Sequence, residues 1–219
     1  MEGGFKVKKP KLRELAEAIK SVIKGPYTTK FPKVAPEIFP EFRGKPEFVE
    51  DNCVLCGACE KICPVDAIEA RDIVNDDGSA KRVMFRNYAR CIWCSMCSIY
   101  CTVGDGDIFG DKTGIKITNE FDLSTLDISS SNEEIESELV VCEKCGKPIT
   151  TKKHLLWLAE RLGSKAFSNQ TLFLTKMQEM GLSDEEMAPP REEMLREDLN
   201  KILCPNCRRS AMMAEDWGF

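Results

Sequence analysis

This sequence is almost without histidine, and it lacks nucleotide-binding loops and long apolar runs. Its 219 residues contain one histidine, His154, which falls in a predicted helix beside Lys152 and Lys153 and is expected at the surface. Neither a GxGxxG motif nor a Walker loop occurs, so no nucleotide site is expected. No apolar run approaches the roughly 18 to 20 residues of a membrane-spanning helix. The chain has no evident catalytic group, and if a membrane matters to it, it lies beside that membrane.

Charge is unevenly distributed along the chain. The mean hydropathy of -0.29 and the 31% of charged residues are typical of a soluble protein. Residues 1–50 carry a net charge of +4, residues 51–141 a net charge of -9, and residues 142–219 none. Phosphate binding needs a basic face, so the acidic middle segment argues against nucleic acid as a partner.

Eight of the twelve cysteines form two runs with one spacing, CxxCxxCxxxC. This is the bacterial spacing that holds two [4Fe-4S] clusters through four thiolates each. Disulfides are expected in small secreted domains, and this chain begins without an apolar signal segment. Zinc sites usually use CxxC pairs that are further apart. Iron-sulfur clusters are therefore the preferred interpretation. The two runs are Cys53, Cys56, Cys59 and Cys63, followed by Cys91, Cys94, Cys97 and Cys101.

The last cysteine of each run is expected to bind the cluster of the other run. In two-cluster ferredoxins this residue begins the next helix and points away from its own loop. Burial and few positive charges near the thiolates predict low, negative reduction potentials for both clusters. The predicted ligand sets are Cys53, Cys56, Cys59 and Cys101 for the first cluster, and Cys91, Cys94, Cys97 and Cys63 for the second.

The segments around the cysteine runs predict an α+β two-cluster ferredoxin domain with pseudo-two-fold symmetry. Residues Ala67–Val74 and Ala80–Tyr88 alternate as two strands, joined by a tight turn at Asn75–Gly78. After the second run, Asp107–Phe109 and Gly114–Thr118 are expected to form the matching pair. Apolar side chains are expected to shield the clusters. They are Ile62, Ile68, Ile92, Trp93, Met96, Tyr100 and Ile108.

Residues 1–50 are predicted to form a basic amphipathic helix and an extended, proline-rich docking arm. Apolar residues recur at helical spacing from Leu12 to Ile23, before Gly25 and Pro26 end the run. Such a helix suits a membrane surface or an integral subunit, or else it packs on its own domain. Five prolines between residues 26 and 46, mixed with aromatic residues, forbid a regular helix. The arm therefore lies along another subunit or along its own cluster domain.

The remaining cysteines predict a helical extension, residues 142–219, that is closed by a metal. Two CxxC pairs complete a tetrahedral site, although 58 residues separate them. Structural zinc is preferred, with rubredoxin-like iron, another cluster or disulfides as alternatives. Helices are expected over Thr151–Leu162, Ser168–Met180 and Arg191–Leu203, with a short turn capped by Ser183 and Glu186. The predicted ligands are Cys142, Cys145, Cys204 and Cys207.

Four glutamates, at residues 133, 134, 136 and 138, predict a solvated acidic linker over residues 129–141. This linker would separate the ferredoxin domain, residues 51–128, from the extension.

The order of these parts resembles the two-[4Fe-4S] ferredoxin-type subunit of respiratory complex I and of energy-converting membrane-bound [NiFe] hydrogenases, including formate hydrogenlyase. The resemblance covers about residues 8–128. The cysteine-bearing extension is similar to one in the formate hydrogenlyase branch. The segments that carry the resemblance are Lys24–Pro26, Pro40–Pro46, the run CVLCGACEKICP with Val65–Ile68, Arg90 before the second run, and Ile117–Leu123.

This resemblance implies an electron-transfer subunit without an active site of its own. It would relay electrons from an input module toward the subunit whose cluster lies nearest the active site, with its N-terminal segment along the membrane arm. The implied partners are hydrogenase-type large and small subunits, an integral membrane subunit, and an electron-donating ferredoxin or formate dehydrogenase module. The implied location is peripheral, on the cytoplasmic side of the membrane. A complex I subunit, a subunit of a soluble ferredoxin-dependent oxidoreductase and a non-redox structural protein are the alternatives.

Two positions depart from the family pattern. Proline usually follows the last cysteine of each run, but only Cys63 has it, as Pro64, whereas Thr102 follows Cys101. The small residue after the second cysteine is kept as Gly57 and becomes Ser95 in the second run. We expect the glycines after Cys101 to supply a different turn there.

Overall fold

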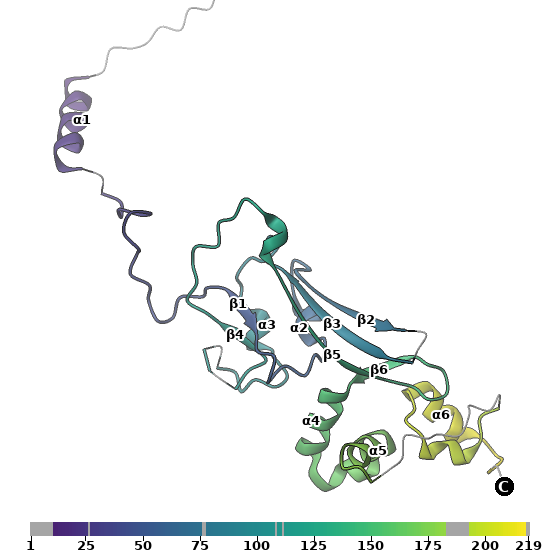
Figure 1. The fold of residues 1–219 in the computed structure, drawn as a ribbon. Helices are drawn as coiled ribbons and strands as arrows, with labels where there is room; N and C mark the ends of the chain where they lie inside the picture. Colours follow the sequence, from purple (N-terminus) through teal and green to yellow (C-terminus); the bar gives the residue numbers. More distant parts are fainter. Residues whose placement is uncertain are drawn as a thin grey trace, which may run out of the picture. The chain divides into compact units, whose positions relative to one another are not determined.

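The computed structural model of this chain describes residues 11–25, 27–75, 78–107, 109–110, 112–182 and 193–217. It divides into two units, Met1–Phe42 and Arg43–Phe219. The described part of the first unit contains helix α1, Leu12–Lys24, which is labelled in Figure 1. The backbone N–H of Lys11 donates to Glu14 at its start, and Gly25 ends it with a φ of 76°. The predicted helix is thus confirmed, and none of its residues is buried.

In the described residues of the proline-rich arm up to Phe42, from residue 27 onward, there is no helix or strand, as the composition predicts. Its last predicted residue, Pro46, belongs instead to strand β1, Pro46–Phe48. Strand β1 pairs antiparallel with β4, Ile115–Ile117, so that Glu47 lies opposite Lys116. The expectation that Asp107–Phe109 pairs with β4 is wrong, because Asp107 and Phe109 are not in a strand and the partner of β4 is β1. Ile108 itself lies outside the described residues.

A four-stranded antiparallel sheet forms the centre of the second unit. Strands β2 (Ile68–Val74) and β3 (Ala80–Asn87) form the predicted hairpin, whose turn residues 76 and 77 are outside the described part of the chain. The order is β2-β3-β5-β6, with β5 at Asn132–Val141 and β6 at Pro148–Thr151. Figure 1 shows β5 running beside β3 along its length.

Strand β5 shows that the predicted acidic linker is wrong over Asn132–Val141. Glu134, Glu136 and Glu138 are exposed, whereas the residues between them are half-buried and Leu139 is buried. This is the two-residue alternation of an antiparallel strand with one face in solvent. The charges mark the outer face of a strand, and the ferredoxin part therefore continues directly into the extension.

Each cysteine run has one short helix, which includes its third cysteine. Helix α2 (Ala58–Ile62) follows Gly57 and includes Cys59, and α3 (Met96–Ile99) includes Cys97. The buried core beneath them joins both runs to both sheets. Its members are Phe48, Cys53, Leu55, Ile68, Met84 and Ile115.

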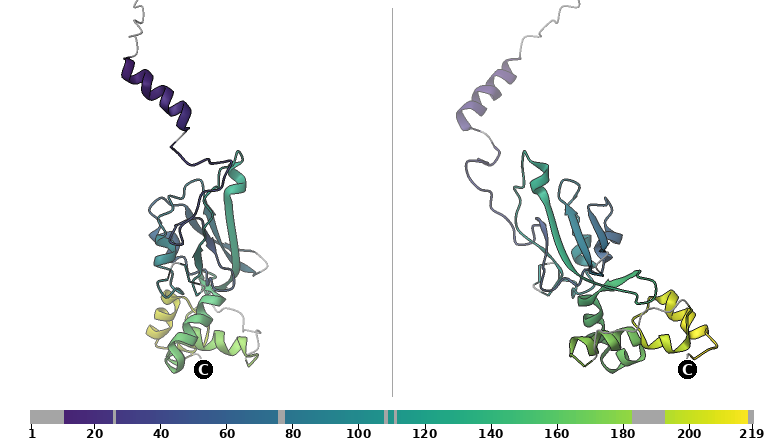
Figure 2. Two further views of the ribbon diagram at one scale, coloured as in Figure 1. Left: turned by 90° about the vertical axis from the view of Figure 1, so that its left-hand side faces the viewer. Right: turned by 45° about the vertical axis from the view of Figure 1, so that its right-hand side comes forward.

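The described part of the extension is mainly helical and lies at one end of the sheet (Figure 2). Helix α4 (Lys152–Leu162) begins after Thr151, whose side chain accepts from the N–H of His154. Helix α5 (Gln170–Glu179) begins after Asn169, which caps it in the same way. Both helices were predicted. A 3₁₀ segment, Gly163–Ser168, connects them.

The third predicted helix, Arg191–Leu203, is wrong. Residues 191 and 192 lie outside the described part, and only the 3₁₀ turn η3, Arg196–Asn200, forms there. The real helix is α6, Pro205–Met213, which begins inside the second CxxC pair. Pro205 at its first position was the available signal. The turn predicted at Ser183 and Glu186 lies outside the described residues. Within the described residues, none of the helices combines the length and apolarity that crossing a membrane requires.

Candidate iron-sulfur and metal sites

The two cysteine loops have the same backbone path. The residue before the second cysteine has positive φ in both runs, 49° at Leu55 and 58° at Trp93. The residue after it is left-handed as well, with φ of 83° at Gly57 and 62° at Ser95. Ser95 therefore keeps the conformation that glycine adopts more easily. The internal repeat predicted from the spacing is present in the backbone itself.

Each cavity between these loops is lined by four cysteines. One is lined by three cysteines of the first run and the last of the second, together with Leu55, Met84 and Ile115. The other is lined by three cysteines of the second run and the last of the first, together with Ile68 and Arg86. The structure thus brings together the members of each predicted set. The sets are Cys53, Cys56, Cys59 and Cys101, and Cys63, Cys91, Cys94 and Cys97.

Burial makes several of these thiols poor acids until a cation reaches them. It raises the pKa of Cys53 and of Cys97 to about 11, and it raises the pKa of Cys59 as well. Four thiols around one mostly apolar cavity fit an iron-sulfur cluster, because bound iron compensates the thiolate charge where water cannot. The backbone N–H of Ala67 already donates to the Cys63 sulfur at 3.2 Å.

The chain after Cys101 turns through glycines, as expected. Gly106 has a φ of 94°. Gly114 lies close to two cysteines of the cavity that Cys53, Cys56, Cys59 and Cys101 line. A Cβ at this position would be 3.2 Å from the Cys101 sulfur and 3.3 Å from the Cys53 Cα. A larger residue at Gly114 would therefore push on the cysteines that line this cavity.

The predicted shield residues are only partly correct. Ile68 is buried and Ile62 and Met96 are half-buried, but Ile92 and Tyr100 are 56% and 57% exposed. Ile92 nevertheless lines the cavity of the second cysteine set, whereas Tyr100 is not among the residues that line either cavity.

Trp93 and His154 have environments that the sequence did not indicate. Trp93 stacks on Tyr88 with ring centroids 6.0 Å apart. His154 is half-buried rather than on the surface, and its Nδ1 lies 2.9 Å from the Thr150 hydroxyl. Burial lowers the pKa of His154, so its neutral form is favoured.

Arg86 is the main site residue that sequence reasoning missed. It is completely buried on β3 and lines the cavity of the second set. Its guanidinium lies over the Phe48 ring at 4.0 Å, and its Nη1 donates to Glu133 at 3.0 Å. Glu133 also accepts from the Tyr88 hydroxyl at 2.6 Å. The expectation of few positive charges near the thiolates is therefore wrong at this cavity.

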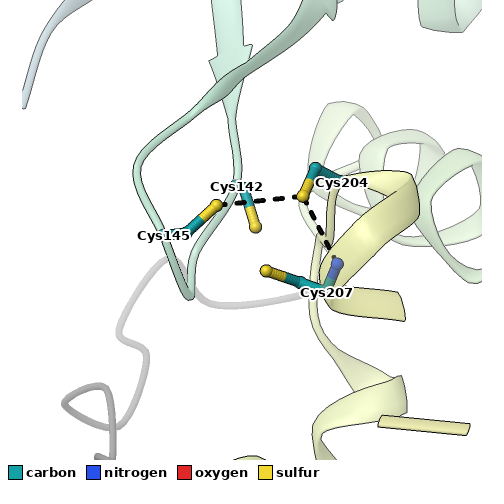
Figure 3. Close-up of side chains that lie close together, drawn as sticks. All are labelled: Cys142, Cys145, Cys204 and Cys207. Atoms are coloured by element: carbon teal, nitrogen blue, oxygen red, sulfur yellow. Dashed lines mark hydrogen bonds between the residues drawn. The ribbon is translucent and has the colours of Figure 1, made fainter. Parts of the chain in front are cut away.

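The four remaining cysteines form a separate group at the base of the extension (Figure 3). Their sulfur atoms all lie within 4.8 Å of one another, as the sequence predicted for a metal site. Cys142 and Cys145 lie on the turn between β5 and β6, where Gly146 has a φ of 67°. Cys204 precedes α6 and Cys207 lies in its first turn. The two pairs thus face each other from a β-turn and a helix start.

This arrangement favours a thiolate at Cys204, whereas burial raises the pKa of Cys207. The backbone N–H of Cys207 donates to the Cys204 sulfur, and this contact, with those to the neighbouring thiols, lowers the pKa of Cys204 to about 7. The Cys145 and Cys204 sulfurs are 3.8 Å apart. Cys142 and Cys204 are buried, whereas Cys145 is exposed, so one ligand position faces solvent.

Comparison with known proteins agrees with the first of these sites. The 4Fe-4S binding domain family matches residues 46–69, which contain β1 and the first cysteine run. The chain is 29% identical over 121 residues to NADH-quinone oxidoreductase subunit I 2 of Geobacter metallireducens, covering 52% of this chain and 85% of that protein. It is 30% identical over 80 residues to the subunit I of Methylococcus capsulatus, covering 34% of this chain and 47% of that protein. The chain therefore carries a ferredoxin-type 4Fe-4S module.

Among solved structures, the chain is similar to a chain of the membrane-bound sulfane sulfur reductase, an archaeal respiratory membrane complex. The sequence identity is 23% and the TM-score is 0.35, with 60% of this chain and 65% of the other covered.

Proposed function

We propose that this chain is the electron-relay subunit of a membrane-bound oxidoreductase related to complex I. It would carry two [4Fe-4S] clusters, held by the cysteine sets that line the two cavities. The observation that carries the proposal is the exchange of the last cysteine between the runs, which puts four thiols around each cavity. The shared core beneath the runs keeps the two cavities adjacent.

When bound, the clusters supply one-electron redox chemistry. The residues of the chain hold and insulate them. Leu55 and Met84 are almost completely buried in the wall of the first cavity, and Ile68 plays the same part in the second. Both walls thus exclude water from the thiolates, which keeps the local dielectric low and makes nearby charges effective.

The hydrogenase branch is our preferred assignment within this class. The four-cysteine extension supports it, since a similar extension accompanies the formate hydrogenlyase branch. The partners would then be hydrogenase-type large and small subunits, an integral membrane subunit and an electron-donating ferredoxin or formate dehydrogenase module. The chain would sit peripherally on the cytoplasmic side. The similarity to NADH-quinone oxidoreductase subunit I favours a second candidate, a complex I subunit.

We propose that the group of Cys142, Cys145, Cys204 and Cys207 binds structural zinc. Four sulfurs within 4.8 Å and a lowered Cys204 pKa favour a tetrahedral thiolate site. Rubredoxin-like iron uses the same ligands and is the alternative.

Anaerobic purification of the native complex through a tag on this chain tests the assignment. We expect about eight cluster irons per chain and two interacting clusters by EPR. The co-purified subunits separate the candidates, because hydrogenase subunits support the first and NADH-oxidising subunits the second. Recovery of the chain alone, or with far less iron, would contradict the electron-relay function.

A further inference from the structure

A buried positive charge adjoins the proposed clusters. Arg86 lies on β3 opposite Ile68 of β2 and Glu133 of β5. None of its surface is exposed, and its guanidinium remains charged at every relevant pH. Of its nitrogens, Nη1 donates to the Pro46 carbonyl and to Glu133. Its Nε and Nη2 have no hydrogen-bond partner among the residues that the structure describes.

Such unpaired buried donors are costly unless a ligand completes them. Arg86 is one of the residues that line the cavity of Cys63, Cys91, Cys94 and Cys97. Its positive charge also opposes the rise that burial causes in the pKa of Cys53 and Cys59, which belong to the first set. The thiolates and the bound cluster would supply the acceptors and the negative charge that this guanidinium lacks.

On the basis of the proposed function, we propose that Arg86 sets the reduction potential of the cluster bound by Cys63, Cys91, Cys94 and Cys97. Adding an electron makes the cluster more negative, so a nearby fixed positive charge favours the reduced form. The low dielectric of the cavity strengthens this effect. Arg86 therefore raises the potential of this cluster, and that of the other cluster to a smaller extent.

Glu133 moderates this effect through its contact with the guanidinium. Its carboxylate accepts from Arg86, from Tyr88 and from the backbone N–H of Phe48 at 2.8 Å. One negative charge beside the guanidinium offsets part of its field. Strand β5 thus supplies a counter-charge that holds Arg86 in place and limits its influence.

Potentiometric EPR titration of the purified complex tests this inference with three variants. Arg86→Met removes the charge, and we expect roughly a tenfold shift of this cluster toward the oxidised form at a fixed potential, which is about 59 mV lower for a one-electron couple. Arg86→Lys keeps the charge and should restore most of the potential. Glu133→Gln removes the counter-charge and should shift the potential upward.

The outcomes separate this inference from the proposed function. Wild-type protein that lacks two reversible clusters would contradict the proposed function. Wild-type protein with both clusters, together with an unchanged potential in iron-replete Arg86→Met, would overturn only the role of Arg86. If Arg86→Met does not fold, Glu133→Gln provides the test, because Gln loses the charge but keeps an acceptor for the Phe48 N–H. Equal cluster potentials in wild type and in iron-replete Glu133→Gln would then overturn the role of Arg86.

Discussion

At the scale of single residues, Cys63 and Cys101 differ from the six other cysteines of the two runs, because they connect the two cavities. Each follows a helix that carries its own run, yet each lines the cavity of the opposite run. A ligand exchange of this kind makes the two sites depend on each other. Membership of a ligand set can be measured, because the iron losses of two substitutions in one set should not add, whereas those of substitutions in different sets should.

Paired serine substitutions test the exchange. Because a cluster lacking one thiolate is poorly held, Cys63→Ser should lose about half of the cluster iron. Combining Cys63→Ser with Cys91→Ser should lose no more, since both belong to one set. Combining Cys63→Ser with Cys53→Ser should remove both clusters. Iron analysis of anaerobically purified protein provides the measurement, and the reverse pattern would show that each run binds its own cluster.

At the scale of elements, helix α1 exposes its whole apolar stripe. Ile19 is 54% exposed and Val22 is 83% exposed, and the helix buries no residue. Nothing in the described part of the first unit covers this stripe, so its cover is either a partner surface or the second unit. The two interpretations left open by the sequence differ in what a charge on this stripe would do.

We expect Ile19→Glu to leave the unfolding temperature and the iron content unchanged while weakening membrane association. Burying an isoleucine side chain is worth about 1.5–3 kcal/mol, so recovery with the membrane fraction should fall roughly tenfold or more. Glu17→Gln is the matched control, because its ion pair with Lys20 is exposed and should contribute little. A lower unfolding temperature for Ile19→Glu would instead show that the helix packs on its own domain.

The elements that sequence reasoning found were those with strong local signals. Helix α4 begins after Thr151 and ends before Gly163, as its cap and stop residues indicate. The cysteine spacing indicated both loops. The four glutamates of β5 are typical of a solvated linker and hide the strand, although their alternation with Ile135 and Leu139 is the pattern of a strand.

The pairing of β1 with β4, and the burial of Arg86, depend on tertiary contacts. Residues far apart in the chain supply them, and no local pattern in the sequence reports such contacts. Arg86 reads locally as one more polar residue of a strand, and only its neighbours Phe48 and Glu133 reveal its burial.

At the scale of the whole second unit, the four-cysteine site lies at the junction of sheet and extension. Cys142, Leu203, Cys204 and Ala211 form one buried cluster, so a metal there would join the β5–β6 turn to α6. A second link comes from Thr151, whose hydroxyl donates to the carbonyl of Val54 in the first cysteine loop. Lys153 donates to the Glu50 carbonyl as well, so several contacts attach the extension to the ferredoxin part.

Metal analysis of Cys145→Ser tests the zinc proposal at this scale. The wild type should hold about one zinc per chain, and the variant should lose it while keeping its cluster iron, because Cys145 is exposed and contributes little packing. We expect a lower unfolding temperature for the extension with unchanged visible absorption of the clusters. Ser210→Ala is the control on α6. One extra iron with a rubredoxin spectrum in place of zinc would identify the alternative metal.

The shared lining of the two cavities also constrains how the protein is made. Neither cavity has all four of its cysteines until the chain has been synthesised at least as far as Cys97. Iron delivered to the emerging first run would find only three of its thiols and a fourth that belongs elsewhere. With the proposed ligand sets, we expect both clusters to be completed only after both runs have left the ribosome.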